Sequence, residues 1–350
     1  MTANAKRIAY FDNWIDPVAE TMLGARSEIE LIRLEMAKPE ADNWAGLSRA
    51  HGYQILPRGD LREPWFGNAA LISKAPRLLA ISSTGAGYDM VDVDACTQAG
   101  IIVVNQTGSN KEAVAEHALG LMLSLSKKMA LTDKALRTGK YVDRYAFTGN
   151  DILGKTVGIV GIGHIGTRVA ELCGGLFRMR VLACDPYLSA AEIKARGAEK
   201  VELGQLLAQS DFVTVHCPRS AETLNMFGAA QFGAMKPSAF FLNTARGGIH
   251  KEDDLAAAIG SGKIAGAGID VFLVEPPPAD HPLLAFDNVI ASPHIAGVTH
   301  EAMHEMARAA AEQWIDLLAG RVPPRLVNPE VWPFYSERFA RELGFMPDAI

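Results

Sequence analysis

The stretch KTVGIVGIGHIGTRVAELCGGLFRMRVLACDP, residues 155–186, decides the fold of this chain. It begins with an apolar run of strand length, residues 157–160, and ends with a second run, residues 179–184. Between the runs, glycines in G-x-G-x-x-G spacing open a segment whose apolar residues share one helical face. The pattern predicts a strand, a tight turn, a helix and a second strand.

Each glycine of this turn has a separate physical task. Gly161 permits the sharp turn, Gly163 lets the backbone approach a pyrophosphate, and Gly166 lets helix and strand pack closely. The N–H groups of His164 and Ile165, at the start of the helix, can bind phosphate oxygens. A glycine-rich turn with only a packing role is the alternative, and the flanking strands and the following acid disfavour it.

Asp185 ends the second strand and points to the kind of dinucleotide. A carboxylate there can accept both hydroxyls of an adenosine ribose, and it would repel a 2′-phosphate. We therefore expect NAD rather than NADP as the cofactor.

The bulk composition is that of a globular protein. The chain has 350 residues, of which 49% are hydrophobic and 21% charged, with a net charge of −6 and both signs interspersed. The sequence shows no basic face or tail of the kind that binds nucleic acids. No run approaches the roughly 18 apolar residues of a membrane span. The start of the chain has no signal-peptide pattern, and the four scattered cysteines predict reduced thiols and no metal site, so we expect a cytoplasmic protein.

Strands alternate with helices along most of the chain, which predicts α/β architecture with parallel sheets. Residues 7–11, 29–34, 53–57, 78–82 and 101–104 are the strand candidates before residue 105, where the pattern breaks in a hinge. A long apolar helix is expected from Lys111 to about Thr138. We expect one domain over residues 110–298, and a discontinuous one over residues 1–109 and 299–350. The tail with Trp332, Phe334 and Tyr335 is expected to pack on the discontinuous domain.

Three loops follow predicted strands on the same side as the glycine turn. They contain Arg246, Glu275 and His294. Because the carboxyl ends of parallel strands share one edge of a sheet, these side chains can meet there. Each also has a plain structural interpretation: a cap donor, a solvated carboxylate or a satisfied core histidine. A fourth loop, TGAGYD at residues 84–89, can offer backbone N–H groups to an anion or can be a turn alone.

These motifs together resemble one family. VGIVGIGHIG with Asp185, HCPRSAET, NTARGG, GIDVF with Glu275, and SPHIAG are similar to the D-isomer-specific 2-hydroxyacid dehydrogenases, as are TGAGYD and NQTGSN followed by VAEH. The resemblance covers about residues 50–320. It implies two Rossmann-like domains with the active site in the cleft between them, and a homodimer.

The resemblance also implies roles for individual residues. Arg246 would bind the substrate carboxylate, and His294, paired with Glu275, would be the acid and base at C2 of the substrate. The loop glycines and alanine, Gly85, Ala86 and Gly87, would bind substrate together with Arg246 and His294. The implied cofactor contacts are Gly161, Gly163, His164, Ile165, Gly166, Asp185, Cys217, Pro218, Thr244, Ala245, Arg246, Asp270, His294, Ala296 and Gly297. Asp270 would lie by the nicotinamide carboxamide.

The expected activity is hydride transfer between NAD(H) and a D-2-hydroxy acid or 2-oxo acid. The alternative is an NAD(H)-sensing, corepressor-like binding protein on the same fold, which would not need all three of Arg246, Glu275 and His294. Formate oxidation is disfavoured, because formate enzymes of this fold use Gln where Glu275 stands. The sequence leaves open which 2-hydroxy acid is used and the physiological direction. Arg58 and Arg62 could meet a substrate phosphate, although solvated surface is favoured.

Overall fold

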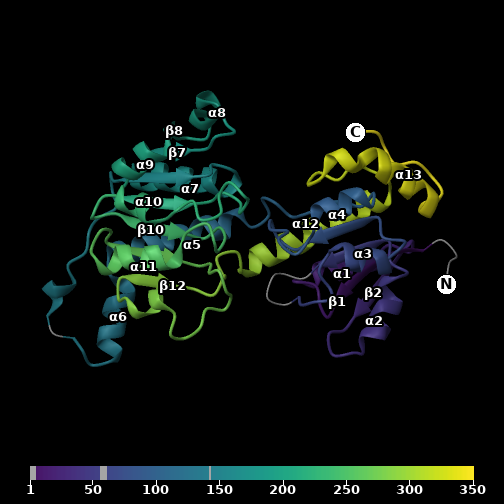
Figure 1. The fold of residues 1–350 in the computed structure, drawn as a ribbon, viewed down its shortest axis with the longest axis horizontal. Helices are drawn as coiled ribbons and strands as arrows, with labels where there is room; N and C mark the ends of the chain where they lie inside the picture. Colours follow the sequence, from purple (N-terminus) through teal and green to yellow (C-terminus); the bar gives the residue numbers. More distant parts are fainter. Residues whose placement is uncertain (1–4, 56–60, 142) are drawn as a thin grey trace. The chain divides into compact units, whose positions relative to one another are not determined.

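The computed structural model describes residues 5–55, 61–141 and 143–350, and the chain forms two compact units (Figure 1). Unit 1 comprises Met1–Asn110 and Thr299–Ile350, and unit 2 comprises Lys111–Val298. Each unit contains one sheet in which the neighbouring named strands pair in parallel. The expected α/β class with two parallel sheets is therefore confirmed.

Unit 1 contains a five-stranded sheet in the order β2-β1-β3-β4-β5. Its strands are β1 (Lys6–Phe11), β2 (Ile29–Leu34), β3 (Gly52–Ile55), β4 (Ala80–Ser83) and β5 (Ile102–Val104). Its helices are α1 (Val18–Gly24), α2 (Glu40–Leu47), α3 (Ala69–Lys74), α4 (Val93–Gln98), α12 (His300–Leu318), the short 3-10 turn η3 (Pro329–Val331) and α13 (Trp332–Leu343). Residues 56–57 of the third predicted strand, and Arg58, lie outside the described residues.

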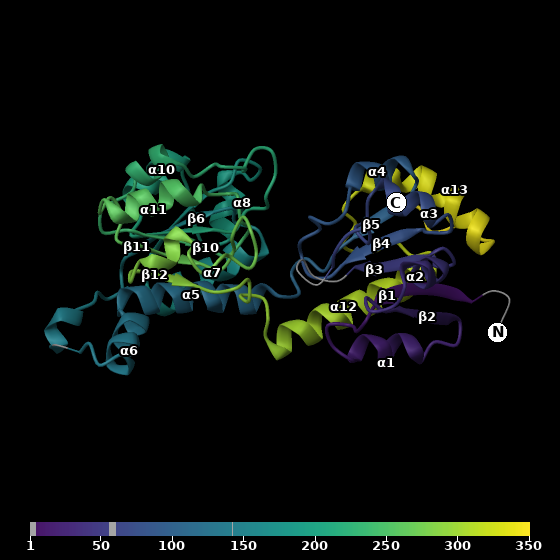
Figure 2. The ribbon, with the colours of Figure 1, turned by 60° about the horizontal axis from the view of Figure 1, so that its bottom comes forward.

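Helices from both ends of the chain cover the sheet of unit 1. On one face, α1, α12 and α13 form a core with Trp314 at its centre. Gly52 of β3 makes this packing possible, because a Cβ atom there would lie 2.4 Å from the Trp314 ring. On the other face, α2, α3 and α4 bury Leu47, Leu71 and Cys96. Figure 2 shows α12 running along this sheet.

The tail of the chain is part of the unit 1 core. Trp332, Tyr335 and Phe339 of α13 are buried beside residues of β1 and β5, so the expected packing on the discontinuous domain is confirmed. The Arg338 guanidinium donates to the carbonyls of Pro76 and Leu78. Phe334 differs from the expectation, because it is 67% exposed on the outer face of the helix.

Unit 2 contains a seven-stranded sheet in the order β12-β11-β10-β9-β6-β7-β8. Its strands are β6 (Thr156–Val160), β7 (Arg180–Cys184), β8 (Glu199–Lys200), β9 (Phe212–Val215), β10 (Phe240–Asn243), β11 (Gly266–Ile269) and β12 (Val289–Ala291). Its helical segments are α5 (Lys111–Ser126), α6 (Met129–Arg137), η1 (Arg144–Phe147), α7 (His164–Phe177), α8 (Ala190–Ala195), α9 (Leu203–Gln209), α10 (Ala229–Gly233), α11 (Glu252–Gly260) and η2 (Pro282–Ala285).

The sheet of unit 2 reverses its winding beside β6. The chain proceeds outward from β6 through β7 and β8, returns to β9 on the other side of β6, and continues to β12. Helices α5 and α7 cover one face, and α9, α10 and α11 cover the other. Ligands of such sheets bind beyond the carboxyl ends of the strands at the reversal point, which is where the glycine turn lies.

The single long helix expected from Lys111 to about Thr138 is wrong. Helix α5 ends at Ser126, and Lys128 adopts a left-handed backbone with φ of +54° before α6 begins. The carbonyl of Ser126 accepts a hydrogen bond from the N–H of Asn150 instead of continuing the helix. Gly149 permits this approach, since a Cβ atom there would lie 2.3 Å from that carbonyl oxygen. A contact distant in sequence therefore breaks a locally continuous helical pattern.

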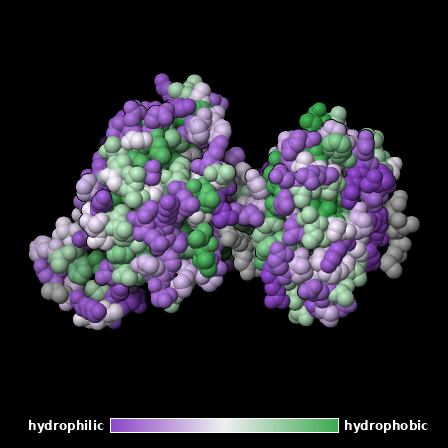
Figure 3. All heavy atoms as spheres, viewed as in Figure 1, coloured by the Kyte–Doolittle hydropathy of each residue, from purple (hydrophilic) through white to green (hydrophobic). Residues whose placement is uncertain are grey.

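Hydrophilic and apolar side chains are interspersed over the visible face of each unit (Figure 3). Among the helices of residues 5–55, 61–141 and 143–350, none has the length and apolar character needed to cross a bilayer.

Candidate active site

The glycine turn of unit 2 has the geometry that a pyrophosphate requires. Gly161 has a φ of +85°, and its N–H donates to the carbonyl of Cys184. A Cβ atom on Gly166 would lie 2.3 Å from the Gly161 carbonyl oxygen, so this position needs glycine for packing. A Cβ atom on Gly163 would meet no atom of the described residues within 4 Å. Space is thus left open directly before α7, whose first turn has N–H groups at His164 and Ile165.

Asp185 is half-buried beside this turn and is already oriented. Its Oδ2 accepts from the N–H of Ile162, and its Oδ1 accepts from the N–H of Tyr187, each at 3.1 Å. A carboxylate oxygen has two lone pairs, so each oxygen can accept one further hydrogen bond from a ribose hydroxyl. The residues therefore fit an adenosine ribose without a 2′-phosphate.

Cys217 and Pro218 follow β9 on the other side of the glycine turn. The backbone of Cys217 is so close to Gly161 that a Cβ on that glycine would lie 2.6 Å from the Cys217 nitrogen. Burial raises the pKa of the Cys217 thiol to about 11, which makes it a neutral packing group. Pro218 is exposed.

His294 and Glu275 form the central pair of the site. The Nδ1 atom of His294 lies 2.9 Å from Oε2 of Glu275, and the other oxygen of Glu275 accepts from the N–H of Phe272 at 3.0 Å. The Glu275 side chain is 15% exposed and the His294 side chain is 33% exposed. The carboxylate is therefore held through both oxygens, and Nε2 is the imidazole nitrogen that does not face Glu275. This arrangement suits proton transfer at Nε2.

His294 has an unusual backbone that the surrounding loop stabilises. Its φ is +56°, in the left-handed region that only a few per cent of non-glycine residues adopt. Its N–H donates to the carbonyl of Asp270 at 2.7 Å. The orientation of the imidazole thus depends on Asp270 as well as on Glu275.

Asp270 is fully buried, and its carboxylate is occupied by the loop that contains His294. Its Oδ1 accepts from the Ser292 hydroxyl at 2.6 Å and from the N–H of Ile295 at 2.9 Å, and its Oδ2 accepts from the N–H of Ala296 at 2.9 Å. The geometry gives Asp270 the task of anchoring this loop, and its expected contact with the nicotinamide carboxamide stays a prediction. Gly297 follows the anchored residues and is half-buried.

Arg246 lies in the loop after β10, next to the loop of Glu275. The two loops touch at Gly247, where a Cβ atom would lie 1.9 Å from the carbonyl oxygen of Phe272. The side-chain amide of buried Asn243 holds the loop by donating to the Arg246 carbonyl, and its oxygen accepts from the N–H of Ala245. Arg246 is half-buried, and its Nη1 donates to the Ala245 carbonyl. The loop thus presents a guanidinium from the same edge of the sheet as the His294–Glu275 pair.

Two further polar groups, Thr244 and His250, are buried in this loop. The Thr244 hydroxyl is buried and has no hydrogen-bond partner within the described part of the chain, so it can accept a ligand contact. His250 is buried, its Nδ1 accepts from the Asn243 amide at 2.9 Å, and burial lowers its pKa to about 4. A neutral His250 therefore orients Asn243, which orients the Arg246 loop.

The loop of Gly85, Ala86 and Gly87 belongs to unit 1. Gly85 has a φ of +79° and exchanges two hydrogen bonds with Gln106, and the Ala86 carbonyl accepts from Asn105. The Ser83 hydroxyl donates to the Gly87 carbonyl. The carbonyls of this loop are thus tied inward, whereas no described hydrogen bond is donated by the N–H groups of Ala86 and Gly87.

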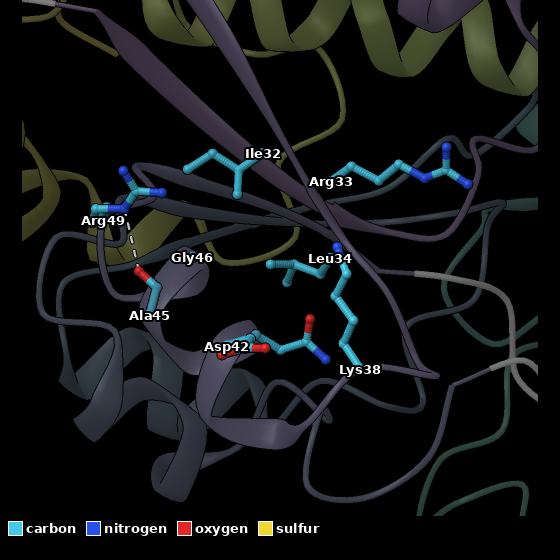
Figure 4. A pocket seen from close by; sticks show the side chains of 9 residues that line it. Ile32, Arg33, Leu34, Lys38, Asp42, Ala45, Gly46 and Arg49 are labelled. Carbon is cyan, nitrogen blue, oxygen red and sulfur yellow. Dashed lines mark hydrogen bonds between the residues drawn. The ribbon is translucent and has the colours of Figure 1, made fainter.

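The remaining candidate features are a possible metal site, a pocket of unit 1 and Arg62. Within the described residues there is no group of three potential metal ligands. Figure 4 shows a pocket of unit 1 on β2 and α2, where Lys38, Asp42 and Arg49 line the rim. Lys38 is paired with Glu35, and no predicted site residue lines this pocket. Arg62 is exposed and reaches the carbonyl of Met36.

Comparisons with known proteins agree with this geometry. The family model for the NAD-binding domain of D-isomer specific 2-hydroxyacid dehydrogenases matches residues 119–296. A D-3-phosphoglycerate dehydrogenase of Archaeoglobus fulgidus is 39% identical over 298 residues, which cover 84% of this chain and 56% of that protein. The chain thus spans about half the length of that relative. A glyoxylate reductase of Korarchaeum cryptofilum is 39% identical over 267 residues, 75% of this chain and 80% of that protein.

Solved structures show the same architecture. The crystal structure of a glyoxylate reductase from Paecilomyes thermophila superposes with a TM-score of 0.82 at 28% sequence identity. The match covers 93% of this chain and 99% of that one.

Proposed function

This chain belongs to the D-isomer specific 2-hydroxyacid dehydrogenase family, and we propose that it transfers a hydride between NAD(H) and C2 of a 2-oxo or D-2-hydroxy acid. The observation that carries the proposal is the contact of 2.9 Å between His294 and Glu275, with the Arg246 loop packed against the Glu275 loop. The bound nicotinamide would supply the hydride, held at the glycine turn and Asp185.

His294 acts as the proton donor in reduction and as the base in oxidation. Glu275 accepts from Nδ1, which orients the ring and leaves Nε2 for proton exchange with the substrate oxygen. Arg246 binds the substrate carboxylate through its planar guanidinium, which matches a carboxylate with two parallel hydrogen bonds. The N–H groups of Ala86 and Gly87 are proposed as further donors to an anionic substrate group.

The alternative function is an NAD(H) sensor that binds the dinucleotide without turnover. The complete set of Arg246, Glu275 and His294 favours the enzyme, because dinucleotide binding alone needs only the glycine turn and Asp185. Formate oxidation remains disfavoured by Glu275.

The test is NADH oxidation with a panel of 2-oxo acids, including glyoxylate, hydroxypyruvate, phosphohydroxypyruvate, pyruvate and bulkier acids. His294→Asn is expected to lower kcat at least ~10²-fold while the Kd for NADH is retained. His300→Asn, an exposed histidine in unit 1, is the matched control and keeps wild-type turnover. Equal kcat in wild type and His294→Asn would remove the proposed role. NADH binding by a wild type that turns over none of the acids would support the sensor.

The proposal also includes an oligomeric state and a cellular location. We propose a homodimer, which the exposed apolar side chains of Met129 and Leu136 on α6 favour, and sedimentation would test it. We propose a cytoplasmic location, which the four free cysteines favour and which cell fractionation would test.

A further inference from the structure

His117 lies on α5, at a point where this helix is pressed against β11. Gly268 of β11 allows the close approach, because a Cβ atom there would lie 3.1 Å from the side chain of Leu121. Leu121 follows His117 by one helical turn, so both residues lie on the same face of α5. Figure 2 shows α5 running along this side of the unit 2 sheet. The imidazole of His117 is thereby directed to the end of β11, where Asp270 and Ser292 meet.

A chain of hydrogen bonds connects His117 to Asp270. The Nε2 atom of His117 lies 3.1 Å from the Ser292 hydroxyl oxygen, which lies 2.6 Å from Oδ1 of Asp270. A hydroxyl has one proton, and an ionised carboxylate can only accept, so Ser292 donates to Asp270. Nε2 of His117 must then be protonated and donate to Ser292. The same nitrogen lies 3.9 Å from Oδ1 of Asp270.

Asp270 in turn contacts the backbone of His294, the residue that transfers the proton in the proposed reaction. Its carboxylate accepts from the N–H groups of Ile295 and Ala296, and its carbonyl accepts from the N–H of His294. His294 is held in a left-handed backbone conformation by these contacts. Rotation of the Asp270 carboxylate would loosen the backbone on the C-terminal side of His294 and change the direction of the imidazole.

We propose that His117 is a positioning residue, which fixes the Ser292 hydroxyl and through it the Asp270 carboxylate, and so holds His294 in its proton-transfer orientation. The proposal rests on the proposed function for its kinetic consequence, but its structural consequence is independent of turnover. The competing interpretation is that His117 only fills space between α5 and β11. Its side chain is 23% exposed, and it donates a hydrogen bond that an apolar residue of the same size could not replace.

The test compares four variants of the 350-residue chain. His117→Ala removes the donor, whereas His117→Gln retains an amide nitrogen at a similar reach and should rescue. Ser292→Ala removes the link between His117 and Asp270. Glu116→Ala changes the neighbouring exposed residue of α5 and serves as the matched control. Active sites are counted by NADH titration, so that a loss of folded protein does not count as a loss of kcat.

Two measurements decide the proposal. Amide hydrogen exchange should be faster at Ile295 and Ala296 in His117→Ala and Ser292→Ala than in wild type, His117→Gln and Glu116→Ala. In the same two variants kcat per NADH site should fall roughly tenfold, as expected for one lost hydrogen bond, with the KM for NADH changed less than about twofold. A pure packing role predicts a lower Tm in His117→Gln as well as His117→Ala, with no selective change at residues 295–296.

Unchanged exchange at Ile295 and Ala296 in His117→Ala would overturn the proposal, whether or not the wild type reduces any 2-oxo acid. Faster exchange with an unchanged kcat would also overturn it, because His294 would then not depend on this anchor. An inactive wild type would refute the proposed function alone, and hydrogen exchange would still decide the role of His117 as the anchor of this loop.

Discussion

Substitution of single glycines by alanine in and near the glycine turn should affect protein stability and NADH binding separately. In Gly163→Ala the new Cβ meets no described atom within 4 Å, so the free energy of unfolding should stay within about 1 kcal/mol of wild type. The open space is where we expect the pyrophosphate, and a methyl group there should weaken NADH binding at least tenfold, or about 1.4 kcal/mol. NADH fluorescence titration and urea denaturation measure the two quantities.

Two other glycines of the same segment supply the controls. Gly166→Ala places a Cβ 2.3 Å from the Gly161 carbonyl oxygen, so overpacking should cost about 1–3 kcal/mol of stability and also weaken NADH binding. Gly175→Ala lies in α7 where a Cβ meets nothing, so it should stabilise the helix by up to about 1 kcal/mol and leave the Kd unchanged. A wild-type Kd for NADH in Gly163→Ala would refute the placement of the pyrophosphate.

Three further predictions follow from the structure. Asp185→Ala should raise kcat/KM with NADPH relative to NADH at least ~10-fold, and an unchanged ratio would argue against its contact with the ribose. Phe339→Ala, in the buried face of α13, should destabilise unit 1 by about 3–5 kcal/mol, whereas Phe334→Ala should change stability by less than about 0.5 kcal/mol; urea denaturation followed by tryptophan fluorescence measures both. Acid should destabilise the protein. Burial lowers the pKa of three histidines in the folded state below the value of about 6.5 in the unfolded chain. Between these pKa values the unfolded state therefore binds more protons than the folded state. This stability is fully present above about pH 6.5. It should be lost as the pH falls toward 4 for His51 and His250 and toward 3 for His216, by up to about 1.4 kcal/mol per pH unit for each histidine. A melting temperature that is constant from pH 7 to 4.5 would contradict the assignment to His51 (pKa about 4), His216 (about 3) and His250 (about 4).

The sequence predicted the elements whose signals are local. The βαβ unit around Gly161 was predictable because a positive φ, a close helix–strand contact and an open approach each require glycine at a fixed spacing. Most strands of both sheets were predictable because each is a short apolar run bounded by turn residues. Helix α2 was missed. The break between α5 and α6 was missed as well, because it depends on Gly149 and Asn150, which approach Ser126 from a later loop.

Some residues of the candidate site could be predicted from the sequence and others could not. Residue type and loop position were enough to single out Arg246, Glu275 and His294, because the strand ends of a parallel sheet share an edge. Ser292 and His117 stand inside the motifs SPHIAG and VAEH, but the sequence assigned no role to them or to His250, since nothing in a single sequence says which polar group a side chain will contact.

The sequence by itself therefore determined the α/β architecture, the dinucleotide turn and the candidates for the reactive groups. The first two follow from backbone conformations and apolar periodicities that neighbouring residues impose, and the candidates follow from residue type and position after predicted strands. Only the tertiary structure decided that the carboxylate of Asp270 holds the loop of His294, and that Glu275 reaches the imidazole nitrogen at 2.9 Å. The physical reason is that a hydrogen bond requires two groups to meet within a few tenths of an ångström, and strand register and loop packing, which bring residues distant in sequence together, set that distance.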